Sequence, residues 1–332
     1  MNVHYEFVRR RFHASGGFSA ACVYKILSVL ALVIIPFLVA FGSHNFWLKR
    51  STYFEQPLIQ FKHKVAVVLE GFKTPDGGGA KQPLNLFWSS VPLMNDVFEA
   101  NLRSPILRSW ADDHNRDGTP DALHVFLRFP LNEGEHIHQV TSVATFDYQL
   151  RDRVKLQMEA MAVVQHGSAV PGAALAADGT LELAQRIPFS VRAGFQELYR
   201  GEDLLPASSS PPASARDVVI PAIVQRYEQR NFTARFDVPY PLWSGSSGLP
   251  AAGVTQRSFA LNMTFRVPSE QDIRYTPDTS ELLKFAWIQY LAIFFVFYYL
   301  LQILDRHVFE NQVVETRVDT EGVYAGPKLH RF

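Results

Sequence analysis

Two long apolar stretches without a charged residue lie near opposite ends of this chain. The first covers residues 26–47 and the second covers residues 285–304. A helix needs about 20 mostly apolar residues to cross the hydrocarbon core of a bilayer, and both stretches are long enough. We therefore predict two transmembrane helices. Because two crossings return the chain to its starting side, both tails face one compartment and the middle faces the other.

The basic residues of the tails predict the orientation. Long loops translocate largely regardless of their charge, so the arginines of the two tails, such as Arg9 to Arg11, favour cytosolic tails. A cleaved signal peptide is the alternative for the first stretch, but its length and the Phe46–Trp47 pair argue against it. The predicted order is a cytosolic tail (1–25), a first transmembrane helix (26–47), a non-cytosolic domain (48–284), a second transmembrane helix (285–304) and a cytosolic tail (305–332).

Charge and cysteine content narrow the possible functions. Lys plus Arg and Asp plus Glu both number 32, so the net charge is zero and gives no sign of a nucleic-acid partner. The one cysteine, Cys22, precedes the first span, so the middle domain has no disulfide. Cys22 is either an unmodified residue of the helix end or a palmitoylation site.

The middle domain has the pattern of an antiparallel β-sandwich with one helix. Asp178-Gly179 predicts a hairpin, because this dipeptide favours tight turns. Asp217 predicts a helix cap for a segment that runs to about Arg230. Runs of β-branched and aromatic residues, or of alternating apolar and polar residues, predict strands at 58–69, 123–129, 140–150, 154–164 and 259–267.

One segment has the spacing of a calcium-binding loop. Oxygen ligands at alternate positions can surround a hard cation, and Gly118 allows the sharp turn between them. An EF-hand is not predicted, because His124 stands where its closing glutamate would be. The alternative is a turn without metal, since these residue types favour turns anyway. The predicted calcium ligands are the side chains of Asp113, Asn115, Asp117 and Asp121 and the carbonyl of Thr119.

Other candidate sites are isolated residues. His136 and His138 are either a zinc pair or solvent-facing histidines, and no third ligand is evident. Sequons predict glycosylation at Asn231 and Asn262, both between the spans. In the second span, Gln289 and Gln302 either hydrogen-bond a neighbouring helix or are solvated or bonded within their own helix. No nucleophile, phosphate-loop or metalloprotease motif occurs, so no enzyme is predicted.

Five segments of the chain resemble the transmembrane protein 231 family, in the same order. The departures are the N-terminal leader and the loops 77–81, 208–215 and 244–252. The matching segments are residues 41–51, 113–123, 227–231, 284–290 and 309–314.

The resemblance implies a structural membrane protein of the ciliary transition zone. Family members belong to a complex with B9-domain proteins, tectonics, meckelin and other membrane proteins. This complex forms a diffusion barrier that controls ciliary membrane composition and supports ciliogenesis and Hedgehog signalling. The alternative function is a calcium-dependent, membrane-anchored receptor or adhesion module, which the loop of residues 113–121 motivates.

Overall fold

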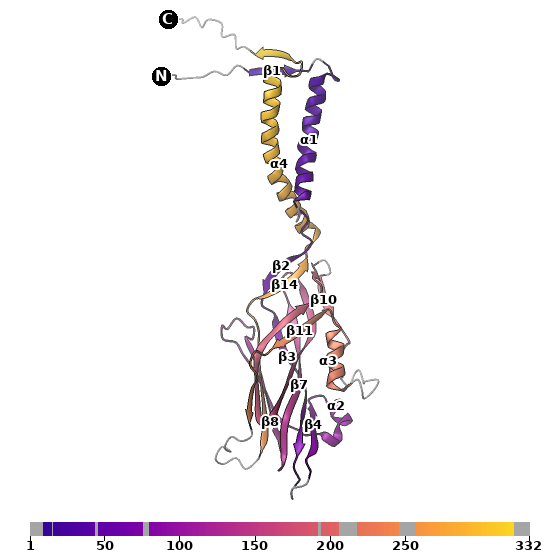
Figure 1. Cartoon of the computed structure of the whole chain (residues 1–332), viewed down its shortest axis with the longest axis vertical. Helices are drawn as coiled ribbons and strands as arrows, with labels where there is room; N and C mark the ends of the chain where they lie inside the picture. The colour runs from indigo at the N-terminus through magenta and orange to yellow at the C-terminus, as the bar shows by residue number, and fades with distance from the viewer. Residues whose placement is uncertain are drawn as a thin grey trace, which may run out of the picture. The chain divides into compact units, whose positions relative to one another are not determined.

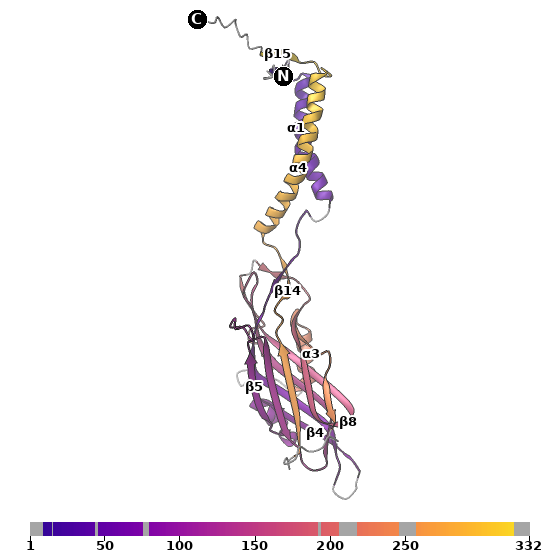
Figure 2. The same ribbon diagram turned by 90° about the vertical axis from the view of Figure 1, so that its left-hand side faces the viewer.

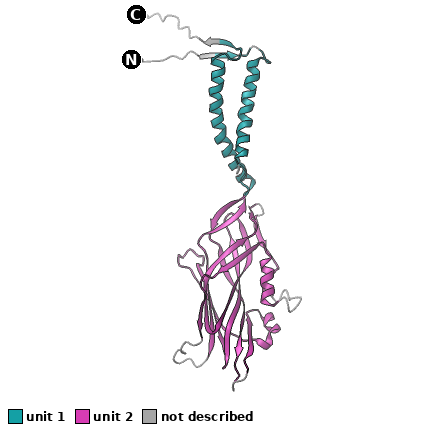
Figure 3. Cartoon of the chain, in the orientation of Figure 1, with its two compact units in different colours: residues 1–49, 277–332 teal, residues 50–276 magenta. Residues whose placement is uncertain are grey.

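The computed structural model divides the chain into two compact units. Unit 1 combines residues 1–49 with 277–332, and unit 2 is residues 50–276 (Figure 3). Unit 2 is rich in β-strand, and the two long apolar helices of unit 1 flank it in the sequence, which confirms the predicted class. The described residues are 9–14, 16–43, 46–75, 80–191, 194–205, 218–245 and 257–321.

Unit 1 consists of two paired helices and a two-stranded sheet. Helix α1 (Ala20–Gly42) and helix α4 (Thr279–Glu310) are both long and apolar enough to cross a membrane. They lie side by side in Figures 1 and 2. Strands β1 (Arg9–His13) and β15 (Arg317–Glu321) pair antiparallel and so join the two tails.

The helix ends differ from the apolar stretches. Helix α1 begins earlier than predicted, because the Ser19 hydroxyl accepts a hydrogen bond from the Cys22 amide (3.4 Å) and caps it. It ends at Gly42, so Phe46 and Trp47 lie beyond it. Helix α4 extends past residues 285–304 at both ends, because the polar residues that flank this apolar stretch are also able to form helix.

Unit 2 contains a ten-stranded and a three-stranded sheet. Its helical elements are α2 (Pro92–Val97), η1 (Glu99–Asn101) and α3 (Ile220–Glu228). The three-stranded sheet has the order β2 (Ser51–Glu55), β14 (Gln271–Thr276), β9 (Phe189–Ser190). Seven strands of the large sheet are neighbours in the order β4 (Gln82–Ser89), β3 (Leu58–Lys73), β7 (Glu135–Leu150), β8 (Lys155–Gln185), β13 (Ser258–Arg266), β6 (Ala122–Pro130), β5 (Ile106–Asp112). The other three strands each pair with β8: β10 (Phe195–Leu198), β11 (Phe232–Asp237) and β12 (Leu242–Gly245).

Strand β8 belongs to both layers of a sandwich-like core. Its first part pairs with β7, from Leu156 to Gly172, and its second part pairs with β11, β12 and β13. Pro171 and Gly172 lie where β8 passes from one layer to the other, and the pairings of β7 and β12 with β8 shift register next to this point. The rings of Phe146 in β7 and Phe265 in β13 lie 4.8 Å apart, although β8 separates their strands. The core therefore forms between the two parts of one sheet.

Two details of the predicted domain are wrong. Asp178-Gly179 is no hairpin but the interior of β8, which runs for 31 residues. A Cβ at Gly179 would lie 2.1 Å from the Asp237 carbonyl oxygen, so this glycine permits the close approach of β11. The sheet is not purely antiparallel, because β10 and β13 pair with β8 in parallel.

The helices agree with the prediction only in part. Helix α3 matches the predicted helix, but Asp217 lies outside the described residues and Val219 occupies the cap position. Helix α2 was not predicted, because a six-residue helix leaves too little periodicity to detect.

The first layer is buried on one face by the main core and on part of the other face by helices. Val67 of β3 points into the main core, whereas its neighbour Ala66 belongs to a second apolar cluster under the helices. Successive residues of a strand face opposite sides of the sheet, so this alternation requires a cover on each side. Helices α2 and α3 provide the outer cover through Met94, Ile223 and Tyr227 (Figure 1).

Candidate functional site

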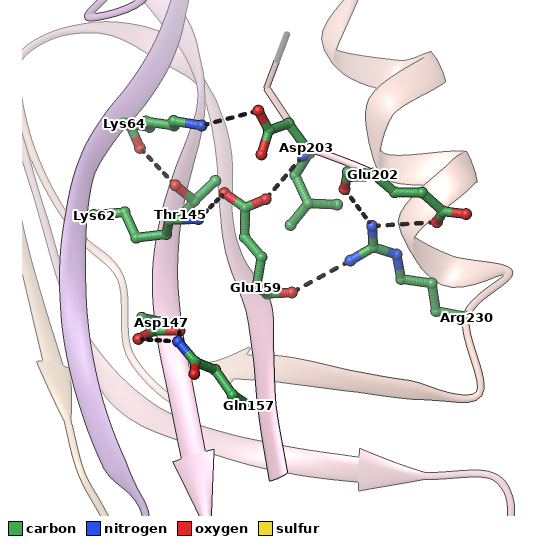
Figure 4. A network of polar contacts seen from close by, with 10 residues as sticks. Lys62, Lys64, Thr145, Asp147, Gln157, Glu159, Glu202, Asp203 and Arg230 are labelled. Carbon is green, nitrogen blue, oxygen red and sulfur yellow. Dashed lines mark hydrogen bonds and ion pairs between the residues drawn. The ribbon is translucent and has the colours of Figure 1, made fainter. Parts of the chain in front are cut away.

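A polar network on the helix-covered face centres on Glu159 of β8. Its carboxylate lies 3.2 Å from the Lys62 ammonium and accepts a hydrogen bond from the Leu204 amide (3.0 Å). The Arg230 guanidinium donates to the Glu159 carbonyl (3.3 Å) (Figure 4). Lys64, near Lys62, lies 3.6 Å from Asp203. These contacts fasten residues 202–205 to the sheet.

Arg230 is the buried cation of this network. Its guanidinium donates to the Glu202 carbonyl (2.9 Å) and lies 4.3 Å from the centre of the Tyr199 ring. Burial lowers the pKa of Arg230, while the Glu202 carboxylate at 3.7 Å opposes that shift. Because each charge here has a partner, the arrangement holds the fold together and leaves no free general acid or base.

The Tyr227 hydroxyl connects α3 to both layers. It accepts hydrogen bonds from the Met161 amide of β8 (3.1 Å) and the Ala234 amide of β11 (2.5 Å), and it donates to the Ala234 carbonyl (3.2 Å). Burial raises the pKa of Tyr227 to about 12. The neutral hydroxyl therefore satisfies the hydrogen bonds of three backbone groups in the core: the Met161 amide, the Ala234 amide and the Ala234 carbonyl.

Among the described residues, two grooves lie beside α3. The first, here called the helix-face groove, has a volume of about 740 Å³, and its described charged lining residues are both glutamates. The second has a volume of about 680 Å³ and a mixed lining that includes Arg186, Arg235 and Arg274. The helix-face groove is lined by α3 and Val219 before it, by Phe98 and Asn101, and mainly by one face of strands β4, β3, β7 and β8.

A tyrosine of β2 holds the short sheet to the β7–β8 turn. The Tyr53 hydroxyl donates to Glu55 (2.9 Å) and accepts from the Val154 amide (3.1 Å), and its ring meets Tyr275 edge-on. Glu55 also accepts from the Arg151 amide (2.6 Å). Because β2 and β14 are the strands of unit 2 nearest in sequence to α1 and α4, this cluster fixes the ends of the domain.

Helices α1 and α4 are connected by an ion pair. The Lys25 ammonium lies 2.5 Å from one oxygen of Asp305, and the Ser28 hydroxyl donates to the other (3.0 Å). Gln302 donates to Tyr298 of its own helix (2.7 Å). Gln289 also lies in α4. The ion pair thus joins two residues that directly flank the apolar stretches, and within the spans the Tyr290 hydroxyl also donates to the Val33 carbonyl (3.5 Å).

The predicted calcium loop forms the turn between β5 and β6. Its carboxylates accept hydrogen bonds from backbone amides: Asp113 from Arg116 (2.7 Å), Asp117 from Thr119 (2.7 Å) and Asp121 from His114 (2.8 Å). The Thr119 contacts, chiefly with its hydroxyl, lower the pKa of Asp117. Within the described residues, no three His, Cys, Asp or Glu side chains are grouped closely enough to hold a metal. Calcium at Asp113, Asn115, Asp117, Thr119 and Asp121 stays a prediction.

The remaining predicted residues lie at the surface of unit 2. Asn231 is exposed between α3 and β11, and Asn262 is exposed on β13, so both side chains are accessible to modification. His136 and His138 share a face of β7, where a ring nitrogen of His138 lies 3.1 Å from the Ser168 carbonyl oxygen. Glycosylation stays a prediction.

Sequence comparison identifies the family. Residues 1–318 match the model of the family described as Transmembrane protein 231. Proteins of this name from Mus musculus and Homo sapiens are each 35% identical to the chain, across 92% of it and across 90% and 91% of their own lengths. The relative from Gallus gallus is 36% identical, over 92% of the chain and 89% of its own length.

A comparison of structures adds nothing to this assignment. A cryo-EM structure of a proton-activated chloride channel aligns with 87% of the chain and 97% of its own, at 6% identity. Its TM-score of 0.28 does not indicate a shared fold. The sequence match to the relatives, together with two helices able to span a membrane, shows a membrane protein. The chain belongs to the Transmembrane protein 231 family.

Proposed function

We propose that this chain is a structural subunit of the membrane complex at the ciliary transition zone. In this role it helps form the diffusion barrier that controls which membrane proteins enter the cilium, and it supports ciliogenesis and Hedgehog signalling. Its partners are B9-domain proteins, tectonics, meckelin and other membrane proteins of that complex. Both termini lie in the cytosol, and unit 2 lies on the other side of the membrane.

Family membership over residues 1–318 carries the proposal, because the resemblance of the sequence implies this role. The architecture supports it. A large β-domain between two long apolar helices offers surfaces for assembly, and the described polar clusters are paired internally, as around Glu159 and Arg230. A subunit of this kind acts through assembly and without turnover.

Localisation and barrier function are tested together in ciliated cells. The chain with a C-terminal tag is expected at the ciliary base, and its deletion is expected to remove membrane partners there and to let excluded membrane proteins enter the cilium. Fluorescence recovery of a membrane protein across the base measures the leak. A tagged chain spread evenly over the plasma membrane, with unchanged ciliary composition after deletion, would contradict the proposal.

A charge in the second span provides the matched loss-of-function variant. Phe295 is 63% exposed on α4, so its side chain faces lipid or another protein. Phe295→Arg is expected to cost roughly 3 kcal/mol of insertion free energy. The variant is therefore expected not to rescue the deletion, whereas Phe295→Leu is expected to rescue it fully.

A further inference from the structure

The helix-face groove is the open continuation of the surface that α2 and α3 cover. Its floor follows the register of four neighbouring strands: Phe87 of β4 pairs with Val68 of β3, Val68 pairs with Thr141 of β7, and Thr141 pairs with Gln165 of β8. These residues share one face of the sheet, and all of them line the groove. Neighbouring residues on the same face of the sheet, such as Met161 and Ala66, are already buried beneath the helices.

The groove is apolar at its centre. The ring of Phe98 lies tilted against that of Phe87, with ring centres 4.3 Å apart, and Val224 of α3 also lines the groove. Val219 at the start of α3 is 40% exposed, and Leu102 beside the groove is 39% exposed. Contiguous exposed apolar surface with a polar rim marks protein interaction sites more often than isolated apolar residues do.

The charges that the described residues place on the rim have one sign. Glu70 of β3 and Glu228 of α3 line the groove, and none of its described lining residues is a lysine, arginine or histidine. Among the contacts of the described residues, neither glutamate has an ion-pair partner. An occupant with basic side chains at the rim would therefore complement the groove.

The geometry favours a helix as the occupant. Strand addition needs a free strand edge, but the edge of β4 is partly closed at Phe87, whose carbonyl accepts from the Arg103 amide (2.9 Å) and which bridges to Leu102. The floor presents side chains of a sheet face, the surface on which α3 itself packs. A volume of about 740 Å³ accommodates one row of apolar anchors.

We propose that the helix-face groove binds an amphipathic helix with apolar anchors and flanking lysine or arginine residues, from a neighbouring membrane protein. This inference rests on the proposed function only in that the donor of the helix is a subunit of the same assembly. The occupant extends the layer formed by α2 and α3, and its basic residues pair with Glu70 and Glu228.

A reporter in the groove tests the proposal on the full chain in nanodiscs of zwitterionic lipid. Cys22→Ser removes the single cysteine, and Gln225→Cys at the exposed rim carries an environment-sensitive fluorophore. The probe is a 14-residue helical peptide of leucine and lysine, compared with one of leucine and glutamate. Only the lysine peptide is expected to cause a saturable blue shift of the fluorophore emission. The same fluorophore at the exposed position Asp237 is expected to show no shift.

Neutral variants provide the matched control. Glu70→Gln with Glu228→Gln is expected to weaken binding of the lysine peptide about tenfold, whereas Glu182→Gln outside the groove is expected to leave it unchanged. Equal responses to both peptides, no saturable shift, or no effect of the double substitution would overturn the proposal. A shift caused by added unlabelled chain without peptide would make a second copy the occupant and would also overturn it. None of these readouts depends on ciliary location, so the proposed function can fail or stand separately.

Discussion

The Lys25 ammonium lies 2.5 Å from the Asp305 carboxylate, and this pair joins the two long helices across 280 positions of sequence. Ser28 binds the second oxygen of Asp305, so the carboxylate has a partner on each side. The pair lies at the tail end of both apolar stretches, where β1 and β15 also join the tails.

Disrupting this pair is expected to loosen the helix pair without unfolding unit 2. Asp305→Asn is expected to cost about 0.5–1 kcal/mol of coupling between the helices, the range measured for polar contacts of this kind. The exchange Lys25→Asp with Asp305→Lys is expected to recover most of that loss. A double-mutant cycle on the thermal stability of the purified chain measures the coupling, and a coupling of zero would contradict a clamp.

The close approach of β11 predicts that Gly179 tolerates no side chain. Gly179→Ala is expected to lower the free energy of unfolding by about 1–3 kcal/mol, because the added Cβ meets the Asp237 carbonyl oxygen at 2.1 Å. Gly167→Ala in the same strand is the matched control. Its Cβ would meet the Gln139 side chain at 3.6 Å, an ordinary contact, so a change within about 0.5 kcal/mol is expected. Equal losses in denaturant melts of the two variants would refute the explanation.

Tyr227 predicts a loss of stability at high pH. Its pKa is about 12 in the folded chain and about 10 when unfolded, so the folded state retains the proton in this interval. The stabilisation is complete below pH 10 and is lost as the pH rises toward 12. Tyr227→Phe removes this contribution. It also leaves the Met161 and Ala234 amides without the hydroxyl that accepts their hydrogen bonds, which is expected to lower the free energy of unfolding by about 1–3 kcal/mol at neutral pH. Stability measured from pH 9 to 12 is expected to fall less steeply in the variant, and parallel curves would contradict the assignment.

The loop between β5 and β6 predicts a calcium response. Millimolar calcium is expected to raise the melting temperature of the full chain, because a ligand that binds only the folded state stabilises it. Asp117→Ala is expected to abolish the rise. Asp178→Asn, at an ion pair with Arg266 elsewhere, is the control and is expected to keep it. Identical melting curves with calcium and with chelator would leave the turn without metal.

Exposure of both sequons predicts two glycans on a non-cytosolic domain. Asn231→Gln and Asn262→Gln are each expected to remove one glycosidase-sensitive step of gel mobility from the chain made in microsomes. Protease added to sealed microsomes is expected to remove a C-terminal tag and to spare residues 50–276. Digestion of the middle with protection of the tag would reverse the proposed topology.

The sequence alone determined the elements whose signal is local. An uncharged apolar stretch dictates a long helix wherever it lies, so α1 and α4 were evident from residues 26–47 and 285–304. Alternation within strands such as 123–129 and the periodicity of α3 were equally local. The family was also evident from the sequence, because each family-specific segment is compared with a known pattern and does not depend on contacts with other parts of the chain.

The tertiary structure alone decided what depends on distant partners. Asp178-Gly179 has the composition of a turn, but β11 and β13 on its two sides make it the interior of a strand. Strand β8 changes layers at Gly172 because its neighbours change there. The Lys25–Asp305 pair and the acidic rim of the helix-face groove join residues far apart in sequence. Side chains at such separations meet only when the whole chain folds, so no local pattern records them.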